Sequence, residues 1–478
     1  MHHVAAALDR LSELAASPTV ATLAAAFEAA GHELALVGGP VRDAFLGRAT
    51  NDLDFTTDAT PDEILAIVKP IAEAHWDIGR QFGTIGAKVA GETVEITTYR
   101  ADTYDGASRK PEVVFGDSIE GDLVRRDFTV NALALRLPRL ELVDPSGGVE
   151  DLIAGVLRTP SAPEVSFGDD PLRMMRAARF ASQLGFSVAS EAVEAMTALA
   201  PEIERISAER VRDELAKLLS TASPVRGIRL LVDSGIADRV LPELPALRLE
   251  RDEHHRHKDV YEHSLTVLEQ AIDYEVSRGV LASPDLVVRL AALLHDIGKP
   301  RTRRFEAGGA VTFHHHDAVG AKLARKRLRA LRFDNDTVDA VARLIELHLR
   351  FFGYTDGAWS DSAVRRYVRD AGSVDQLERL HILSRADVTT RNRRKADMLS
   401  FAYDDLEHRI AELASQEELA AVRPELDGAQ IMALLGISPG PVVGEAYRFL
   451  LELRLDEGPI GEDAARERLL AWWAQRGA

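Results

Sequence analysis

Apolar and polar residues follow two different periods along the chain, and the change between them lies near Pro171. Through the first third, apolar residues alternate with polar ones in short runs bounded by turn residues, which is typical of half-buried strands. The runs that predict strands are residues 34–38, 53–56, 84–89, 93–97 and 113–115. We therefore expect residues 31–155 to form an α/β domain with helical stretches between strands.

From Pro171 onward, apolar residues recur every three or four positions, the spacing that places side chains on one face of an α-helix. Two such stretches contain Leu172, Met175, Ala178 and Phe180, and then Val211, Leu215, Leu218 and Leu219. The rest of the chain is therefore expected to be almost entirely helical.

A chain of 478 residues exceeds what one hydrophobic core usually serves, so we expect several domains. Proline-containing segments at 223–224 and 241–245 and a histidine-rich segment after Arg251 mark candidate boundaries. The expected order is a helical extension at 1–30, an α/β head at 31–155, a helical neck at 156–245, a second helical domain at 246–395 and a helical tail region at 396–478.

The composition is that of a globular protein, with 46% hydrophobic and 28% charged residues. No apolar run approaches the roughly 20 residues needed to cross a bilayer. Charges at Asp9, Arg10 and Glu13 interrupt the segment where a signal peptide would need an apolar core. We therefore expect a cytoplasmic protein with no membrane partner.

The chain has no cysteine, which excludes disulfides, thiolate zinc sites and cysteine nucleophiles. Any metal must be held by carboxylate, histidine or backbone oxygen. The net charge of −18 opposes nucleic-acid binding over the whole surface, so such binding would need local basic patches. Two candidate patches consist of Lys322, Arg325, Lys326, Arg327, Arg329 and Arg332, and of Arg391, Arg393, Arg394 and Lys395. Solvated helix surfaces paired with acidic residues are the alternative interpretation of both.

Two short motifs in the first domain are suited to nucleotide chemistry. Gly38 and Gly39 follow a strand and precede a helix, where bare backbone N–H groups can approach a triphosphate and Arg42 can clamp a phosphate oxygen. An ordinary turn is the alternative. Asp52 and Asp54 lie at i and i+2 of a strand, where they would repel each other unless a cation lies between them.

Paired carboxylates of this kind suit divalent ions that activate a 3′ hydroxyl and neutralise leaving pyrophosphate. Glu95, on a later candidate strand, is either a third acidic neighbour or an exposed residue on an edge strand.

These motifs continue, in order, to Asp122-Leu123-x-Arg125-Arg126-Asp127-Phe128-Thr129-x-Asn131-Ala132. Together with Gly38-Gly39-x-Val41-Arg42-Asp43 and Asp52-x-Asp54, the series resembles the class II tRNA nucleotidyltransferase and bacterial poly(A) polymerase family. The resemblance implies a head of the polymerase-β nucleotidyltransferase type, with Asp52 and Asp54 as catalytic magnesium ligands. It also implies that Gly39, Arg42 and Arg126 contact the nucleotide.

The predicted neck begins with Asp170, Arg173, Arg176 and Arg179, spaced three apart as on one helical face. Cytosine and adenine both present an amino donor beside a ring-nitrogen acceptor, so an accepting Asp and a donating Arg match C and A and reject U and G. A helix stabilised by an Asp–Arg pair is the alternative. In the resembled family this motif reads Glu-Asp-x-x-Arg and pairs with the incoming base, with the following arginines near the nucleotide; Asp169 replaces the Glu here.

A histidine and aspartate series follows at His263, His295-Asp296, His316-Asp317, His348 and Asp387. It resembles the HD phosphohydrolase domain, with Leu-Leu-His-Asp-Ile-Gly-Lys as the strongest match. The resemblance implies a divalent transition metal on His263, His295, Asp296 and Asp387, able to generate a metal-bound hydroxide for phosphoester hydrolysis. A domain that packs against RNA without catalysis is the alternative.

The sequence therefore predicts an enzyme that adds CCA to the 3′ end of tRNA without a template, using CTP, ATP and Mg²⁺ and releasing pyrophosphate. A poly(A) polymerase or an enzyme that adds only the terminal A fits the same motifs. Two further alternatives are an HD phosphohydrolase that uses the head as a binding module, and a non-catalytic RNA-binding scaffold.

Overall fold

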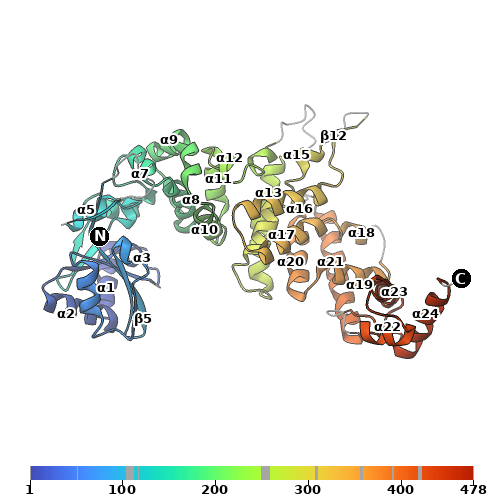
Figure 1. The fold of residues 1–478 in the computed structure, drawn as a ribbon. Helices are drawn as coiled ribbons and strands as arrows, with labels where there is room; N and C mark the ends of the chain where they lie inside the picture. The colour runs from blue at the N-terminus through green and yellow to red at the C-terminus, as the bar shows by residue number, and fades with distance from the viewer. Residues whose placement is uncertain are drawn as a thin grey trace. The chain divides into compact units, whose positions relative to one another are not determined.

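The computed structural model describes residues 2–50, 52–103, 112–116, 118–248, 259–306, 311–355, 359–389, 392–417 and 422–476. The chain divides into two compact units, Met1–Val240 and Leu241–Ala478. The first runs from blue to green in Figure 1 and contains the sheet, whereas the second runs from yellow to red and, in its described residues, is helical apart from one small hairpin. The expected α/β head with a helical remainder is confirmed. None of the described helices is long and apolar enough to span a membrane.

A seven-stranded mixed sheet forms the centre of the first unit, in the order β3-β4-β5-β2-β1-β8-β9. Its strands are β1 (Leu34–Val37), β2 (Leu53–Thr57), β3 (Ala74–Trp76), β4 (Thr84–Val89), β5 (Glu92–Thr98), β8 (Ala134–Leu137) and β9 (Glu141–Val143). β2 and β5 pair in parallel, and the other neighbours are antiparallel. A separate hairpin pairs β6 (Arg100–Thr103) with β7 (Glu112–Phe115).

All five strands expected from alternation are present, but β3, β6, β8 and β9 were not expected. Each of these four has only three or four residues, which weakens the pattern but does not by itself hide a strand, since β1 and β7 also have four and were expected. β8 nevertheless lies beside the fully buried β1, so its position comes from the sheet and not from its own sequence pattern.

Helices α2 (Pro18–Ala30), α3 (Gly39–Leu46) and α4 (Pro61–Val68) pack on the sheet, and α1 (His2–Ala15) packs on α3. Ser17 caps α2 by accepting from the Val20 N–H, and Val20 and Phe27 are fully buried. Arg10 of α1 donates to the Ala44 carbonyl of α3 at 2.6 Å. The first 30 residues therefore pack against the head.

The chain leaves the sheet through α5 (Ile119–Val124), η2 (Thr129–Asn131), α6 (Gly148–Ala154) and the short parallel pair β10 (Val156–Leu157) and β11 (Ser187–Val188). The helices that follow are α7 (Pro163–Asp169), α8 (Leu172–Leu184), α9 (Ser190–Leu199), α10 (Ala208–Leu219), α11 (Val225–Asp233) and α12 (Ala237–Val240). α8 packs against α10 and α11 with Met174, Met175 and Ala178 buried. Gly227 permits the close approach of α11, because a Cβ there would lie 2.3 Å from the Ala178 carbonyl oxygen.

The second unit begins with five packed helices, α13 (Val260–Arg278), α14 (Leu286–Leu294), α16 (His316–Ala330), α17 (Asn335–Leu347) and α20 (Val374–Ala386). Asp259, Asp285, Asp334 and Ser373 cap four of them by accepting from first-turn N–H groups. Shorter elements are η4 (Pro245–Leu247), α15 (Lys299–Thr302), the hairpin β12 (Arg304–Phe305) and β13 (Val311–Thr312), and α18 (Phe352–Thr355).

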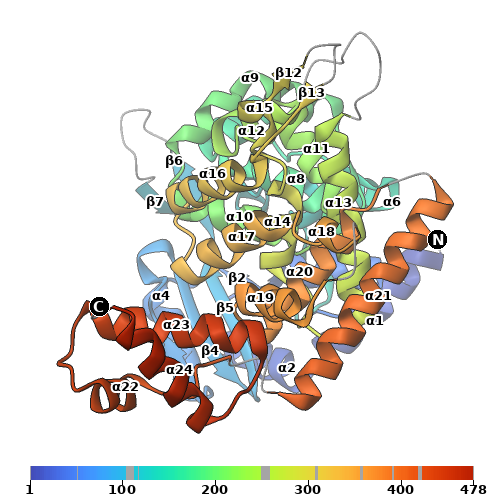
Figure 2. The same cartoon turned by 90° about the vertical axis from the view of Figure 1, so that its right-hand side faces the viewer.

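The described part of the second unit ends with α19 (Asp361–Ala371), α21 (Arg393–Gln416), α22 (Gly428–Leu435), α23 (Pro441–Glu457) and α24 (Glu462–Ala474), which are orange and red in Figure 2. Ile431, Leu450 and Leu469 of the last three helices meet in a small apolar core. A buried Glu417 accepts from Arg365 of α19 and Arg454 of α23, so these two helices are joined by an ion triad.

Candidate active site in the first unit and histidine cluster in the second

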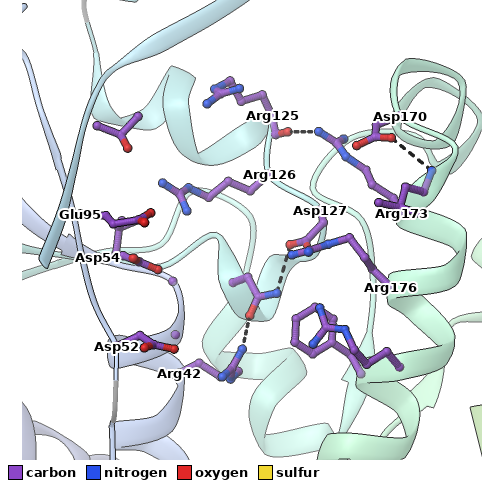
Figure 3. A pocket seen from close by; sticks show the side chains of 18 of the residues that line it. Arg42, Asp52, Asp54, Glu95, Arg125, Arg126, Asp127, Asp170, Arg173 and Arg176 are labelled. Carbon is purple, nitrogen blue, oxygen red and sulfur yellow. Dashed lines mark hydrogen bonds and ion pairs between the residues drawn. The ribbon is translucent and has the colours of Figure 1, made fainter. Parts of the chain in front are cut away.

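A pocket of about 570 Å³ opens where the ends of β1, β2 and β5 face α8. Thirteen charged residues line it: Arg42, Asp52, Asp54, Glu95, Arg100, Arg125, Arg126, Asp127, Asp170, Arg173, Arg176, Arg179 and Arg210. In Figure 3 the carboxylates of Asp52, Asp54 and Glu95 lie on one side, and Asp170, Arg173 and Arg176 lie on the other. All the residues that the sequence predicts for the nucleotide site therefore line one pocket.

The turn between β1 and α3 lies at the edge of this pocket. Gly38 has φ 74°, a conformation that favours glycine, and the Gly38 N–H donates to the Leu133 carbonyl. A Cβ on Gly38 would lie 3.5 Å from an Arg126 guanidinium nitrogen. That is an ordinary van der Waals distance, so the positive φ and not the room for Arg126 is what favours glycine at this turn, and Gly39 begins α3 in the pocket wall.

The acidic side of the pocket is built by two parallel strands. Asp54 of β2 and Glu95 of β5 are paired across the ladder, and Asp52 immediately precedes β2. The pKa of Asp54 is raised by burial and by the charge of Glu95, with Arg126 opposing and Asp52 adding to the rise. Asp52, Asp54 and Glu95 offer carboxylate oxygens alone, the ligand type that a hard divalent cation such as Mg²⁺ prefers.

A relay of hydrogen bonds joins three elements behind the pocket. Arg42 of α3 donates to the Asn131 side-chain oxygen at 2.7 Å, and the Asn131 amide donates to Asp127 at 3.0 Å. Asp127 also binds Arg176 of α8 at 2.6 Å. Burial opposes the charge of Asp127, but Arg176 and the hydrogen bond from Asn131 lower its pKa. Asp127 and Asn131 thus hold Arg42 and Arg176 in place.

Asp122 holds two further arginines of the pocket, Arg125 and Arg126, in place. Its fully buried carboxylate binds Arg125 at 3.2 Å and Arg126 at 3.1 Å. Burial works against the charge, yet Arg126 and Arg125 lower the pKa of Asp122. Asp122 therefore holds the Arg126 side chain, and the Arg126 guanidinium lies beside Gly38 and Asp54.

Asp170 does not begin the helix that carries Arg173, contrary to the expected helical row. It lies just after α7 in an extended conformation (φ −135°, ψ 96°), because a residue before proline avoids the helical region, and α8 begins at Leu172. Asp170 pairs with Arg210 at 2.9 Å. Arg173 donates to Ser166 Oγ at 2.8 Å and to the Arg125 carbonyl at 2.6 Å.

The alternative prediction was that Asp170 and Arg173 pair with each other and stabilise a helix. The described contacts contradict it, because Asp170 pairs with Arg210 and Arg173 binds Ser166. Arg210 was not predicted for the site. It lies in α10, and no local pattern shows that α10 approaches the end of α7.

Arg179 differs from the other arginines of α8. It is 9% exposed, binds Glu214 of α10 at 2.7 Å and lies 4.0 Å from the centre of the Phe180 ring. Burial lowers its pKa despite the Glu214 carboxylate. Arg179 lines the pocket, but its guanidinium is already engaged by α10.

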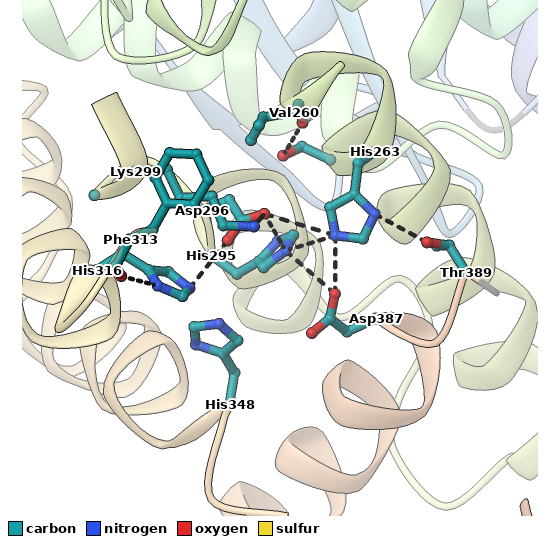
Figure 4. Close-up of polar contacts among 12 residues, drawn as sticks. Val260, His263, His295, Asp296, Lys299, Phe313, His316, His348, Asp387 and Thr389 are labelled. Carbon is teal, nitrogen blue, oxygen red and sulfur yellow. Dashed lines mark hydrogen bonds and ion pairs between the residues drawn. The ribbon is translucent and has the colours of Figure 1, made fainter. Parts of the chain in front are cut away.

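The second unit gathers the predicted HD residues into one buried cluster (Figure 4). His263 comes from α13, His295 and Asp296 from the end of α14, and Asp387 from the end of α20. His263 Nε2 lies 2.9 Å from Asp387 Oδ1 and 3.3 Å from His295 Nε2, and His295 Nε2 lies 3.2 Å from Asp296 Oδ2.

Burial opposes the charging of His295, but Asp296 and Asp387 raise its pKa to about 10. A proton there balances the two carboxylates, and a cation would displace it.

Two further histidines complete the cluster. His316 of α16 and His348 at the end of α17 form, with Asp296, a second group of potential metal ligands in the described residues. Asp317, adjacent to His316 in the sequence, belongs to neither group, and His314 and His315 are exposed.

Gly298 of the Leu-Leu-His-Asp-Ile-Gly-Lys segment positions α16. A Cβ at Gly298 would lie 2.0 Å from the His316 carbonyl oxygen and 2.7 Å from the Gly320 nitrogen. We expect Gly298→Ala to lower stability by about 1–3 kcal/mol, as overpacking does, and to displace His316. Gly444→Ala, at an exposed helical position with open space around it, should instead stabilise by about 0.5–1 kcal/mol. Denaturant unfolding of both variants measures this, and an unchanged Gly298→Ala midpoint would contradict the close packing.

The two basic patches have different surroundings. In the first, Arg327 binds Glu243 at 2.8 Å, and Arg325 and Arg329 both approach Asp339. In the second, Arg393, Arg394 and Lys395 are exposed on the first turn of α21, and Arg391 lies outside the described residues. The alternative of acid-paired surface thus applies to Arg325, Arg327 and Arg329 of the first patch.

Comparison with known proteins agrees with these features. Residues 34–158 match the family model of the poly A polymerase head domain, residues 185–247 that of the probable RNA- and SrmB-binding site of polymerase A, and residues 260–392 that of the HD domain. The CCA-adding enzyme of Bacillus stearothermophilus, solved with CTP, superposes with a TM-score of 0.69 at 24% identity over 95% of this chain and 97% of that one. A Thermotoga maritima CCA-adding enzyme solved with tRNA gives a TM-score of 0.60 at 20% identity, covering 98% of each chain.

Two sequence relatives have higher sequence identity to this chain than these structures do. A CCA-adding enzyme of Geobacillus thermodenitrificans is 41% identical over 208 residues, which is 43% of this chain and 50% of that protein. The A-adding tRNA nucleotidyltransferase of Deinococcus radiodurans is 35% identical over 450 residues, covering 92% of this chain and 95% of that protein. Because this similarity extends along nearly all of both chains, and the head, neck and HD motifs are all present, the chain belongs to the tRNA nucleotidyltransferase family and is a nucleotidyltransferase with an HD domain.

Proposed function

We propose that this enzyme adds C, C and A in turn to the 3′ end of tRNA, using CTP and ATP and releasing pyrophosphate. One observation carries the proposal: a single pocket has a carboxylate-only wall at Asp54 and Glu95 and, across from it, Asp170 and Arg173. The first wall suits nucleotidyl transfer and the second suits recognition of a base.

Asp52 and Asp54 are the residues that would hold magnesium, with Glu95 as their acidic neighbour. Bound there, Mg²⁺ would supply Lewis-acid activation of the RNA 3′ hydroxyl and neutralise charge on the triphosphate. Arg42 and Arg126 oppose the triphosphate charge from the side of Gly38, and their anchors Asn131 and Asp122 fix their orientation before a nucleotide arrives.

Asp170 and Arg173 are proposed to test the incoming base. The Asp170 carboxylate accepts from the exocyclic amino group that C and A share, and Arg173 donates to the adjacent ring nitrogen. U and G present the opposite order, which leaves a buried donor or acceptor unpaired. Arg173 is held by Ser166 and by the Arg125 carbonyl, so its donors are positioned by protein and not by an RNA template.

Addition of only the terminal A is the second candidate, because a relative that matches along nearly the whole chain is an A-adding enzyme. The base-reading pair fits adenine in either case. The two candidates differ in whether CTP is used.

For the second unit, we propose that His263, His295, Asp296 and Asp387 bind a divalent transition metal. Neutral imidazole and carboxylate are borderline and hard ligands that suit Mn²⁺, Fe²⁺, Co²⁺, Ni²⁺ or Zn²⁺. When bound, such a metal supplies an activated water for phosphoester hydrolysis.

Product length decides between the candidates. Purified enzyme and Mg²⁺ are incubated with tRNA that lacks its CCA end and, separately, with tRNA that ends in CC, with CTP and ATP alone and together. We expect two C additions with CTP alone, three ordered additions with both, and one A on the tRNA ending in CC. Extension only of the tRNA ending in CC would establish A addition, long A tracts would establish a poly(A) polymerase, and no extension would overturn nucleotidyl transfer to tRNA.

A further inference from the structure

The small hairpin of the second unit, labelled β12 and β13 in Figure 2, has two chemically different faces. Its strands pair antiparallel, with Phe305 opposite Val311 and Arg304 opposite Thr312. Directly opposed residues and residues two apart share a face, because successive side chains point to opposite sides of a hairpin. With the flanking residues continued in register, the first face carries Arg303, Phe305, Val311 and Phe313, and the second carries Arg304, Glu306 and Thr312. We call the first one the aromatic face.

Contacts within the hairpin agree with this division. The Arg303 guanidinium carbon lies 4.8 Å from the centre of the Phe305 ring, so an arginine and a phenyl ring lie together on the aromatic face. On the second face, the Thr312 hydroxyl donates to the Glu306 carboxylate at 3.1 Å. The acidic group of the hairpin is therefore held away from Phe305.

The Phe305 ring is 69% exposed. Single exposed apolar side chains are common on protein surfaces, so exposure alone does not indicate a partner. Here, however, the exposed ring has a guanidinium beside it, and a ring with an adjacent arginine is the arrangement on which nucleic-acid bases stack. The surroundings of Phe305 therefore decide its interpretation.

The arginines of this segment have no acidic partner among the described residues. Arg301 and Arg304 are exposed and Arg303 is half-buried, and none of the three forms an ion pair with a described carboxylate. Arg289 of the same unit, in contrast, is paired with Glu275 at 3.0 Å. In a chain of net charge −18, unpaired arginines around an exposed ring favour an anionic partner that has flat apolar groups.

The aromatic face ends beside the histidine cluster (Figure 4). The half-buried Phe313 accepts through its carbonyl from His316 Nδ1 at 2.8 Å. The centre of the Phe313 ring lies 5.7 Å from the Lys299 ammonium nitrogen. A ligand that extends along the face from Phe305 therefore meets a second ring and a second cation.

We propose that the aromatic face binds single-stranded RNA, with a base stacked on Phe305 and a neighbouring phosphate held by Arg303. A single strand fits better than a duplex, because its bases have open faces for stacking. An acidic peptide would use the arginines but not the ring. The choice of RNA rests on the function proposed above, whereas stacking on Phe305 requires neither nucleotide addition nor a metal.

Fluorescence anisotropy with full-length protein and a labelled single-stranded RNA of about eight nucleotides tests the stacking. We expect Phe305→Ala to raise Kd by about tenfold or more. Phe305→Leu should do the same, because leucine keeps apolar bulk without an aromatic face, and Phe305→Trp should bind at least as tightly as wild type. Phe401→Ala is the matched control, since Phe401 is a 74% exposed phenylalanine of α21 in the same unit, and it should keep the wild-type Kd.

The salt dependence of Kd tests the phosphate contact. Arg303→Gln should reduce the slope of log Kd against log salt by about 0.7, the value for one phosphate contact on a single strand. Arg304→Gln removes the same charge from the neighbouring residue on the opposite face, and it should change both Kd and the slope much less.

Quenching of the tryptophan introduced by Phe305→Trp, compared with wild type, reports whether a base reaches the hairpin. An unchanged Kd in Phe305→Ala and Phe305→Leu, absence of this quenching, equal affinity for a duplex of the same sequence, or equal effects of Arg303→Gln and Arg304→Gln would each overturn the proposal. Displacement of the RNA by an equal concentration of polyglutamate would also overturn it, in favour of an acidic protein partner. Nucleotide addition is scored separately by product length on tRNA, so either proposal can fail alone.

Discussion

Replacing Asp54 by Ala is expected to lower kcat for nucleotide addition by about 10³-fold or more, because it removes the buried carboxylate that would hold Mg²⁺ at the reacting phosphate. Single-turnover extension of tRNA at saturating CTP or ATP measures the loss. Asp58→Ala is the matched control, since Asp58 follows the same strand but binds His32 and the Glu33 N–H outside the pocket. A loss of less than tenfold in Asp54→Ala would contradict the assignment.

The same carboxylate should reduce the stability of the metal-free protein. Burial, Glu95 and Asp52 raise the pKa of Asp54, so its charged form destabilises the fold above the unfolded-state pKa of about 3.9. The isosteric Asp54→Asn variant is therefore expected to unfold at a higher temperature than wild type near pH 7 with EDTA present. The difference should shrink as the pH falls through the raised pKa, where Asp54 becomes neutral, and saturating Mg²⁺ should stabilise only the wild type.

Replacing Arg173 by Lys should impair base selection more than triphosphate binding. Lysine keeps the charge but lacks the planar fork that Ser166 and the Arg125 carbonyl orient. We expect kcat/KM for ATP to fall by about 10²-fold, and the preference for ATP over GTP and for CTP over UTP to fall by at least about tenfold, because the wrong base no longer leaves a buried donor unpaired.

Competition between correct and wrong nucleotides measures the preference as a ratio, which is independent of the amount of folded enzyme. Arg158→Lys is the control, because Arg158 of the same unit binds Asp151 and Glu191 away from the pocket. If Arg173→Lys slows addition but keeps the full preference for ATP and CTP, Arg173 contacts something other than the base.

The sequence was informative wherever a pattern is local. Alternation identified β4 and β5, and the turn at Gly38 and the carboxylates Asp52 and Asp54 were evident from short spacings. The expected helical row that begins at Asp170 was wrong, because Asp170 lies between α7 and α8 in the extended conformation that a residue before proline favours. β8 and β9 were not expected, and their place in the sheet comes from pairing with β1 and with each other.

The sequence by itself determined the α/β head, the helical remainder and the chemistry of the motifs, because periodicity, turns and ligand types depend on neighbouring residues. Only the tertiary structure decided which motifs meet. Parallel pairing of β2 with β5 puts Glu95 beside Asp54, the packing of α10 brings Arg210 to Asp170, and five helices converge to leave His316 and His348 facing Asp296. These contacts join residues far apart in the chain, and burial of the apolar faces of sheets and helices fixes them, which no local pattern encodes.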